Sequence, residues 1–240
     1  GGRPSCCERG RPAVLPSHAL GAVSHSDSDG GQGSLVTVAN NRGLNAKRGF
    51  DFVASALLLL VTSPLLLALA MAVRMTSKGP ALFRQERVGL RGETFRIHKF
   101  RSMKAEFSGD LFSATGDWRI TGGGQFLSKS KLDELPQFLD VLLGHMSLVG
   151  PRPEVPQYVD MWPAGRRQII LSVRPGITDP ASIALRNEAD ELAAAEDPER
   201  HYIETLLPRK TAAYVDYVKS RSFVGDLAVI GHTLTTVIKG

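Results

Sequence analysis

The sequence contains little cysteine. Its 240 residues include only two, Cys6 and Cys7, which are adjacent in the chain. Adjacent cysteines provide neither the paired framework of a disulfide-rich domain nor the ligand spacing of a structural zinc site. The chain is therefore predicted to fold around a hydrophobic core, which its 42% apolar content permits. This cysteine usage fits a reducing compartment such as the cytoplasm.

Aromatic residues and negative charge are also in short supply. Aromatic side chains make up 7% of the chain, and the formal net charge is +5. Such a balance favours an anionic partner, which can be a phospholipid headgroup, a nucleotide or a nucleic acid. No nucleic acid is expected, because the basic residues gather around an apolar run without a recognition-helix, RNA-binding or aromatic-stacking pattern. Salt-sensitive binding of an oligonucleotide would revive that alternative.

Long hydrophobic runs are absent except for one, at residues 52–73. A straight helix across a bilayer needs about 20 apolar residues, and this run is barely long enough before Pro64 removes a backbone donor and bends it. Basic residues flank both ends, so the positive-inside preference gives no asymmetry. We predict a re-entrant helix-break-helix that dips into one leaflet and returns. At the break, the Ser63 hydroxyl bonds a carbonyl that the proline frees.

This run has three other interpretations. A helix that spans the bilayer stays open. A buried core helix is disfavoured, because the leucines at 57–60 and 65–67 surround the helix and leave no polar face. A signal peptide is not expected, because the run lies far along the chain and no small-residue cleavage site follows it.

The predicted fold class is α+β and mainly helical. Residues 1–45 are rich in Gly, Ser, Pro and Asp, which predicts a disordered tail. Residues 46–78 form the re-entrant membrane hairpin, and residues 79–240 form a compact cytoplasmic catalytic domain with a small β-hairpin and interfacial helices. The expected strands are 81–85 and 94–100, joined by a glycine-bearing loop. The other expected elements are a mobile loop at 106–124, a stiff turn at 149–154, and helices at 131–144, 154–172, 188–194, 198–220 and 223–238.

Two neighbouring carboxylates, Asp133 and Glu134, begin the predicted helix at 131–144. The plain interpretation is helix capping, since Ser130 and Asp133 satisfy the S-x-x-D pattern and acids favour a helix N-terminus. The lysines around them favour a second interpretation. A carboxylate beside cations stays ionised, can hold Mg²⁺, and can attack phosphorus when the substrate phosphates are neutralised.

Several cations are candidates for binding phosphate. Arg152 lies between two prolines that fix its backbone, and its planar fork suits a phosphate. Lys99 and Arg101 follow the second predicted strand, where alternation places them on the same face. Their plain interpretation is a solvated basic surface or contact with anionic lipid. Arg174 precedes another proline and ranks below Arg152, with a simple turn as its alternative.

Six segments, in this order, resemble the bacterial sugar transferase family, in its small monotopic form. Members of this form are phosphoglycosyl transferases that initiate polysaccharide, O-antigen or glycoprotein-glycan assembly. The resemblance begins near Lys47. The segments are KRGFD at 47–51, SP at 63–64, KFRSM at 99–103, LDELPQ at 132–137, MSLVGPRP at 146–153 and RPGIT at 174–178.

The resemblance implies a reaction and a place for it. A sugar 1-phosphate moves from a UDP-sugar donor to a polyprenyl phosphate acceptor, giving a polyprenyl-diphosphate-sugar and UMP, with Mg²⁺ as cofactor. Asp133 is implied as the nucleophile and Glu134 as its partner in metal binding or proton transfer, while Lys99, Arg101 and Arg152 neutralise phosphate charge. The enzyme is expected to contact membrane lipid on the cytoplasmic face of the bacterial inner membrane. A homodimer is a possible oligomeric state.

This chain departs from the family pattern at a few positions. Ser128 stands where the family usually has arginine, with Lys129 beside it as an imperfect substitute. Asp140 and His145 replace Asn and Asp, and Asp179 begins a variant continuation after RPGIT. The continuation at Asp179 resembles a recognised family variant, whereas Ser128, Asp140 and His145 favour one alternative, a catalytically impaired membrane-anchored scaffold of the same family. The retention of Lys99, Arg152 and both carboxylates argues for the enzyme.

Overall fold

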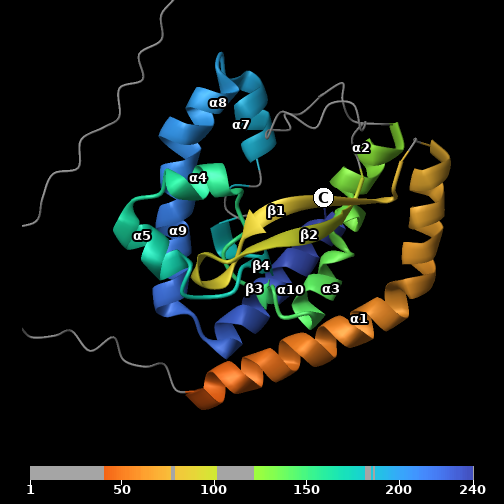
Figure 1. Cartoon of the computed structure of the whole chain (residues 1–240), viewed down its shortest axis with the longest axis horizontal. Helices are drawn as coiled ribbons and strands as arrows, with labels where there is room; N and C mark the ends of the chain where they lie inside the picture. The colour runs from red at the N-terminus through yellow and green to blue at the C-terminus, as the bar shows by residue number, and fades with distance from the viewer. Residues whose placement is uncertain (1–40, 77–78, 102–121, 182–184, 186, 240) are drawn as a thin grey trace, which may run out of the picture. The chain divides into compact units, whose positions relative to one another are not determined.

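The computed structural model describes residues 41–76, 79–101, 122–181, 185 and 187–239, which belong to one compact unit (Figure 1). The predicted tail at 1–45 lies outside the described residues up to position 40. Its last five residues are helical rather than disordered, because they continue into the helix that follows. The predicted mobile loop lies outside the described residues except for 122–124, which begin a helix and so correct that prediction.

Helix α1 (Asn41–Thr76) contains the apolar run and is helical without interruption. The predicted interruption of the helix at Ser63 and Pro64 is wrong, because the helix continues through both residues. The helix α1 is nevertheless visibly bent (Figure 1). Proline is the usual cause of such a bend. The Ser63 hydroxyl donates to the carbonyl of Leu60 at 2.7 Å, and this is the carbonyl that Pro64 leaves without a helical donor. The predicted role of Ser63 is confirmed, and it explains why the helix continues through the proline.

The apolar face of α1 is exposed rather than packed. The stretch Ala46–Met75 is long and apolar enough to cross a membrane, and 6% of its most apolar window is buried. A core helix would be mostly buried, so that alternative is excluded. Exposed apolar surface of this extent indicates membrane association.

The predicted β-hairpin is confirmed. Strands β1 (Leu82–Val88) and β2 (Thr94–Phe100) pair antiparallel, with Leu82 opposite Phe100. The loop between them includes the 3₁₀ turn η1 (Leu90–Gly92), in which Arg91 and Gly92 both have positive φ. Two such residues give the chain the tight reversal that the loop glycines predicted.

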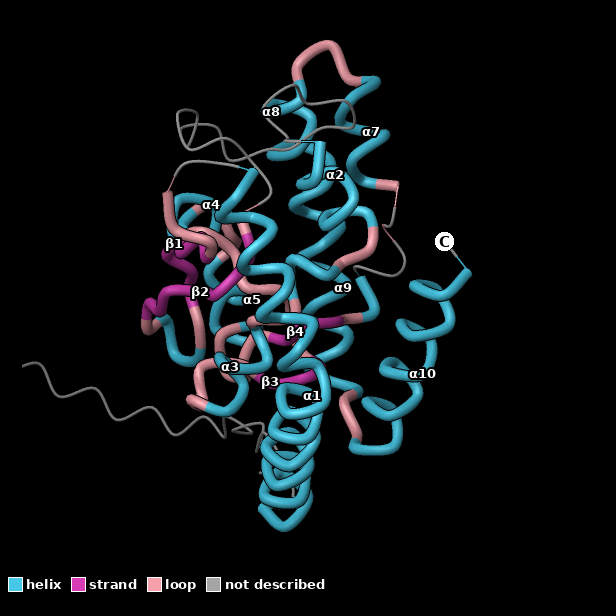
Figure 2. The backbone as a smooth tube through the Cα atoms, turned by 90° about the vertical axis from the view of Figure 1, so that its right-hand side faces the viewer, coloured by secondary structure: helices cyan, strands magenta, loops and turns pink. Residues whose placement is uncertain are grey.

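A second, parallel sheet was not predicted. Strand β3 (Ser147–Val149) pairs with β4 (Gly176–Thr178). The backbones touch closely at their ends, since a Cβ on Gly176 would overlap with the backbone of Gly150. Each strand has three residues, too few for alternation to reveal it. Both strands contact α10, and both views place them near α10 and α3 (Figures 1 and 2).

The predicted helix at 131–144 is confirmed only for its second half, and its first half is wrong. The chain forms α2 (Gly122–Lys129), the 3₁₀ turn η3 (Leu132–Glu134) and α3 (Gln137–Leu142). Lys131 has a φ of 58°, which ends α2 and starts a separate turn. Ser130 donates to the carbonyl of Phe126 at 2.7 Å, so it belongs to the end of α2 and does not cap a following helix.

The remaining helices follow the predictions, with one correction. The helix expected at 154–172 is split by Pro163, which precedes its second half and has no N–H to continue the first. The stretch predicted at 198–220 is helical throughout and includes a π-helical turn. The elements are α4 (Pro156–Asp160), α5 (Ala164–Ile170), α7 (Glu188–Ala194), α8 (Pro198–His201), η4 (Tyr202–Leu206), α9 (Leu207–Ser220) and α10 (Phe223–Lys239).

Two hydrophobic clusters hold these elements together. The first lies among α4, α5 and α9, around Tyr158, Leu206 and Tyr214. The second joins the hairpin to α3, β3 and α10, around Met146 and Val149. The first turns of α1 are tied to α10 through an ion pair between Lys47 and Asp226.

Candidate active site

Asp133 lies in the η3 turn and is 1% exposed. The Nζ atom of Lys99, from β2, lies 2.8 Å from Asp133 Oδ2. The left-handed Lys131 and the following Pro136 confine Asp133 to a short turn rather than a helix. The hairpin and the turn therefore bring together two residues that are 34 positions apart in the sequence.

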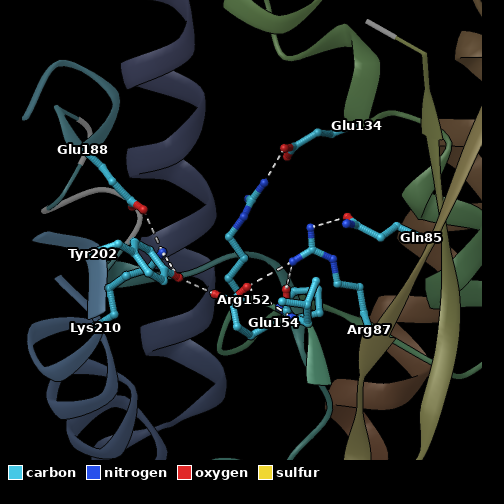
Figure 3. A network of polar contacts seen from close by, with 10 residues as sticks. Gln85, Arg87, Glu134, Arg152, Glu154, Glu188, Tyr202 and Lys210 are labelled. Atoms are coloured by element: carbon cyan, nitrogen blue, oxygen red, sulfur yellow. Dashed lines mark hydrogen bonds and ion pairs between the residues drawn. The ribbon is translucent and has the colours of Figure 1, made fainter. Parts of the chain in front are cut away.

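Glu134 joins the same cluster through Arg152. One guanidinium nitrogen of Arg152 lies 2.5 Å from Glu134 Oε1 (Figure 3). Lys99 Nζ lies 3.6 Å from the same oxygen. Burial raises the pKa of Glu134, but the charges of Arg152 and Lys99 outweigh it and hold that pKa well below its usual range. Glu134 in turn raises the pKa of the Arg152 guanidinium. The site thus holds two carboxylates and two cations in contact.

The turn that carries Arg152 is held by a second polar network, drawn in Figure 3. Arg87 donates to the carbonyl of Pro153 and to the Glu154 carboxylate, each at 3.2 Å. Tyr202 donates to the other Glu154 oxygen at 2.6 Å, and a lysine of α9 contacts the Tyr202 hydroxyl at 3.4 Å. These contacts fix the backbone on the C-terminal side of Arg152, so its direction does not depend on its ion pair alone.

The other sequence-predicted cations occupy different places. Arg101 follows β2 and is 7% exposed, with its guanidinium so close to Gly79 that a Cβ there would overlap a terminal nitrogen. Lys129 ends α2, and its side chain lies outside the described residues. Arg174 donates through Nε to the carbonyl of Gly144 at 2.8 Å and lines a separate cavity. Among the described contacts, only the lysine of β2 and the arginine between the two prolines reach the two carboxylates.

In the sequence, Asp140 is only a departure from the family pattern. In the structure, it holds His98 in place through two contacts. Asp140 is fully buried, and its Oδ2 accepts the backbone N–H of His98 at 2.9 Å. Its Oδ1 lies 2.7 Å from Nδ1 of the same histidine. Asp140 therefore clamps the residue next to Lys99. The other departure, His145, stacks on Phe95 with ring centroids 5.5 Å apart.

We expect Asp140→Ala to lower the free energy of unfolding by roughly 3 kcal/mol, because it leaves a buried backbone donor without its acceptor. It should also lower activity by freeing the strand that carries Lys99. Thermal unfolding and turnover measure the two effects. The matched control is Asp160→Ala, since Asp160 is exposed and forms one surface ion pair, with Arg167. Equal effects of the two variants would contradict the clamp.

The carboxylates also permit a divalent cation. Neither oxygen of Asp133 accepts a hydrogen bond from the described part of the chain, although Lys99 lies beside one of them. The described residues contain no group of three or more His, Cys, Asp or Glu side chains placed to hold a metal. Mg²⁺ commonly binds through one or two carboxylates together with substrate phosphates. The donor set of Asp133 and Glu134 fits that mode.

Comparison with known proteins gives a consistent picture. The chain is 38% identical over 201 residues to a UDP-N-acetylgalactosamine-undecaprenyl-phosphate N-acetylgalactosaminephosphotransferase of Aeromonas hydrophila, which covers 81% of this chain. It is 38% identical over 197 residues to a UDP-glucose:undecaprenyl-phosphate glucose-1-phosphate transferase of Caulobacter vibrioides, which covers 80% of this chain. The alignments span 44% of the first relative and 69% of the second.

A third relative is similar in length to the aligned region. The exopolysaccharide production protein PSS of Rhizobium leguminosarum is 35% identical over 201 residues, which are 79% of this chain and 94% of that protein. The family match is broader still, because residues 42–240 fit the bacterial sugar transferase family. This range contains both carboxylates and all the cations that contact them. The chain belongs to the bacterial sugar transferase family.

Proposed function

We propose that this protein is a phosphoglycosyl transferase that moves a sugar 1-phosphate from a UDP-sugar to undecaprenyl phosphate or a related polyprenyl phosphate. The observation that carries the proposal is the buried Asp133 carboxylate, 2.8 Å from Lys99 and beside the Glu134–Arg152 ion pair. A nucleophile surrounded by cations suits attack on a phosphoryl group. The activities named for the Aeromonas and Caulobacter relatives support the same reaction class.

The proposed reaction has two steps at one phosphorus atom. A carboxylate oxygen of Asp133 attacks the sugar-bearing phosphorus of the donor, and the bond to the bridging oxygen breaks, so that UMP leaves. The phosphate oxygen of the acceptor then attacks the same phosphorus, and the bond to Asp133 breaks. The products are the polyprenyl-diphosphate-sugar and free carboxylate. Two steps allow a soluble donor and a lipid acceptor to use the site in turn.

The charges around Asp133 have separate roles in this scheme. Lys99 and Arg152 stabilise the negative charge that the transferring phosphoryl group presents, which is the main task in phosphoryl transfer. Arg101 is proposed to assist them from the end of β2. Mg²⁺, held by Asp133 and Glu134, would supply further neutralisation of the donor diphosphate. Glu134 also keeps Arg152 directed at the site through their ion pair.

We also propose that α1 enters the membrane as a re-entrant hairpin, with both ends on the cytoplasmic face. The bend in α1, the Ser63 contact with Leu60 and the exposed apolar surface support this geometry. A shallow insertion would hold the site at the interface, where a polyprenyl phosphate presents its headgroup. Soluble donor would arrive from the cytosol.

The topology predicts an effect of Pro64→Leu. Restoring a straight helix should favour full insertion and carry residues 1–40 to the other side of the membrane. The native thiols of Cys6 and Cys7 report this, because an impermeant maleimide added to intact spheroplasts should label the variant and not the wild type. Thr62→Ala is the matched control, since it removes a side-chain bond to the carbonyl of Leu58 in the same helix but leaves Pro64 in place. Equal labelling of wild type and Pro64→Leu would contradict the re-entrant hairpin.

The reaction is tested by UMP release from purified full chain with Mg²⁺, undecaprenyl phosphate and a panel of UDP-sugars. We expect continuous release with a preferred donor. Without acceptor, release should stop near one UMP per enzyme, because the phosphosugar remains on Asp133. A folded protein that releases no UMP with any donor would favour the scaffold, for which Ser128 is the argument from the sequence.

A further inference from the structure

A second basic site lies where the first turns of α1 meet the core. The cavity there has a volume of about 220 Å³. It receives residues from α1, the hairpin loop, β3, the segment before β4, and the end of α9. None of the active-site residues Lys99, Asp133, Glu134 and Arg152 lines it.

The lining carries a large excess of positive charge. Its five cations are Lys47, Arg48, Arg91, Arg174 and Arg221, and its one carboxylate is Asp51. Lys47 is paired with Asp226. None of the four arginines forms a salt bridge within the part of the chain that the structure describes.

Asp51 offsets only part of this charge, because one carboxylate stands against five cations and interacts with Lys47 and Arg48 among them. It is 3% exposed, and it accepts a hydrogen bond of 2.6 Å from the hydroxyl of Ser147 on β3. The contact holds α1 against β3. The cavity therefore gathers more guanidinium groups than its single carboxylate can pair with, and such an excess of positive charge attracts an anion.

Contacts within the chain hold the side chain of Arg174 and the backbone of Arg91 before any ligand arrives. Arg174 uses Nε to bond the carbonyl of Gly144 at 2.8 Å, and its two terminal nitrogens make no hydrogen bond to the described residues. Arg91 has a φ of 59°, a conformation that is uncommon outside glycine. Its backbone N–H bonds the carbonyl of Leu171 at 2.7 Å, which fixes the loop at the cavity. The fork of Arg174 is thus preorganised, and the fixed loop carries Arg91 beside it, which suits the oxygens of a phosphate.

The size and position of the cavity restrict its ligand. Ordinary pockets for small molecules measure about 300–1,000 Å³, so this one is too small for a complete nucleotide sugar. It is lined in part by the first turns of α1, where the exposed apolar surface begins with Phe50, 37% exposed, and Phe52, 51% exposed. A phosphate at the cavity would leave room for an acyl chain along that surface.

We propose that this cavity is a second phosphate-binding site, which takes the headgroup of an anionic phospholipid and so anchors the start of α1 at the interface. The site is separate from the proposed reaction and does not depend on it. Free phosphate offers the same chemistry to the arginines, so the test must distinguish the two sources.

The test measures binding to the full chain in neutral detergent by isothermal titration calorimetry, with dihexanoyl phosphatidylglycerol and inorganic phosphate as separate probes. We expect the lipid to bind, and Arg91→Gln combined with Arg174→Gln to raise its Kd by about tenfold or more, because two charge-assisted contacts are lost. Arg84→Gln is the matched control, since Arg84 is exposed and lies outside the cavity. Lys99→Gln should also keep lipid binding, which separates this site from the active site.

Each result decides the proposal. Binding of the lipid with little binding of inorganic phosphate supports the headgroup site. Equal binding of both probes, lost in the double variant, overturns the lipid source and assigns the cavity to soluble phosphate. Absence of binding by both, or lipid binding unchanged in the folded double variant, overturns the phosphate site altogether.

Discussion

Asp133→Asn is expected to reduce UMP release by roughly 10³-fold or more, because an amide cannot serve as the nucleophile that attacks phosphorus. The substitution preserves the size of the side chain in a site where the residue is 1% exposed. It also removes the negative charge that faces Lys99. The folded structure should survive, because Lys99 is part-exposed and can be solvated. Turnover is measured with the preferred UDP-sugar, and folding by thermal unfolding.

The control for this prediction is Asp160→Asn, at an aspartate whose side chain is 68% exposed. It should leave UMP release unchanged. A second readout is the acceptor-free burst of UMP, which should disappear in Asp133→Asn. If the variant kept that burst, another residue would be the nucleophile, and the assignment of Asp133 would fail even though the reaction class stood.

Arg152→Gln is expected to lower turnover by roughly 10²–10³-fold, as loss of a charged donor to a transferring group commonly does. It also leaves Glu134, which is 8% exposed, without its nearest cation. We expect the free energy of unfolding to fall by roughly 2 kcal/mol at neutral pH, since the Arg152 side chain is part-exposed and the full penalty of a buried pair does not apply.

The stability difference should depend on pH in a defined direction. In the wild type the pKa of Glu134 is depressed, so its ion pair contributes stability above the ordinary glutamate pKa of about 4.3, and that contribution is lost as the pH falls further. Without Arg152, the pKa of Glu134 should rise, because Lys99 and Lys131 are then the charges that oppose the effect of burial. The difference between wild type and variant should therefore narrow below about pH 4. Thermal unfolding at several pH values measures it, and a difference that widened on acidification would contradict the pairing.

A matched pair of variants separates charge from geometry at Arg152. Arg152→Lys keeps the positive charge but loses the planar fork. Arg152→Lys should keep most of the wild-type stability. If Arg152 contacts two oxygens of a phosphate, the turnover of Arg152→Lys should stay close to that of Arg152→Gln. Full recovery of turnover by lysine would show that Arg152 acts as a point charge only.

The β-hairpin and the effect of Pro64 could be predicted because their signals are local. Glycines bound the hairpin loop, and the proline removes a single donor whose acceptor Ser63 satisfies. The helix predicted around Asp133 failed for an equally local reason that sequence patterns did not reveal. Lys131 adopts a left-handed backbone conformation, and lysine carries no preference that signals it.

Contacts between distant segments could not be predicted in the same way. The pairing of β3 with β4 joins strands of three residues, which show no alternation. The bond between Asp140 and His98 spans 42 positions. Asp140 and His98 are polar residue types that usually lie on the surface. Only the tertiary structure buries Asp140 fully and places it against His98.

The sequence alone established three features: the apolar segment bent by proline, the β-hairpin, and the ordered segments of the bacterial sugar transferase family. Local propensity, hydrophobicity and motif order are properties of neighbouring residues, so the order of amino acids is enough to reveal them. Only the tertiary structure established which cations contact the two carboxylates. Lys99 and Arg152 reach Asp133 and Glu134, while Arg174 lies in the separate basic cavity. Charges interact through space, over distances that only the packing of hairpin, turn and helices sets.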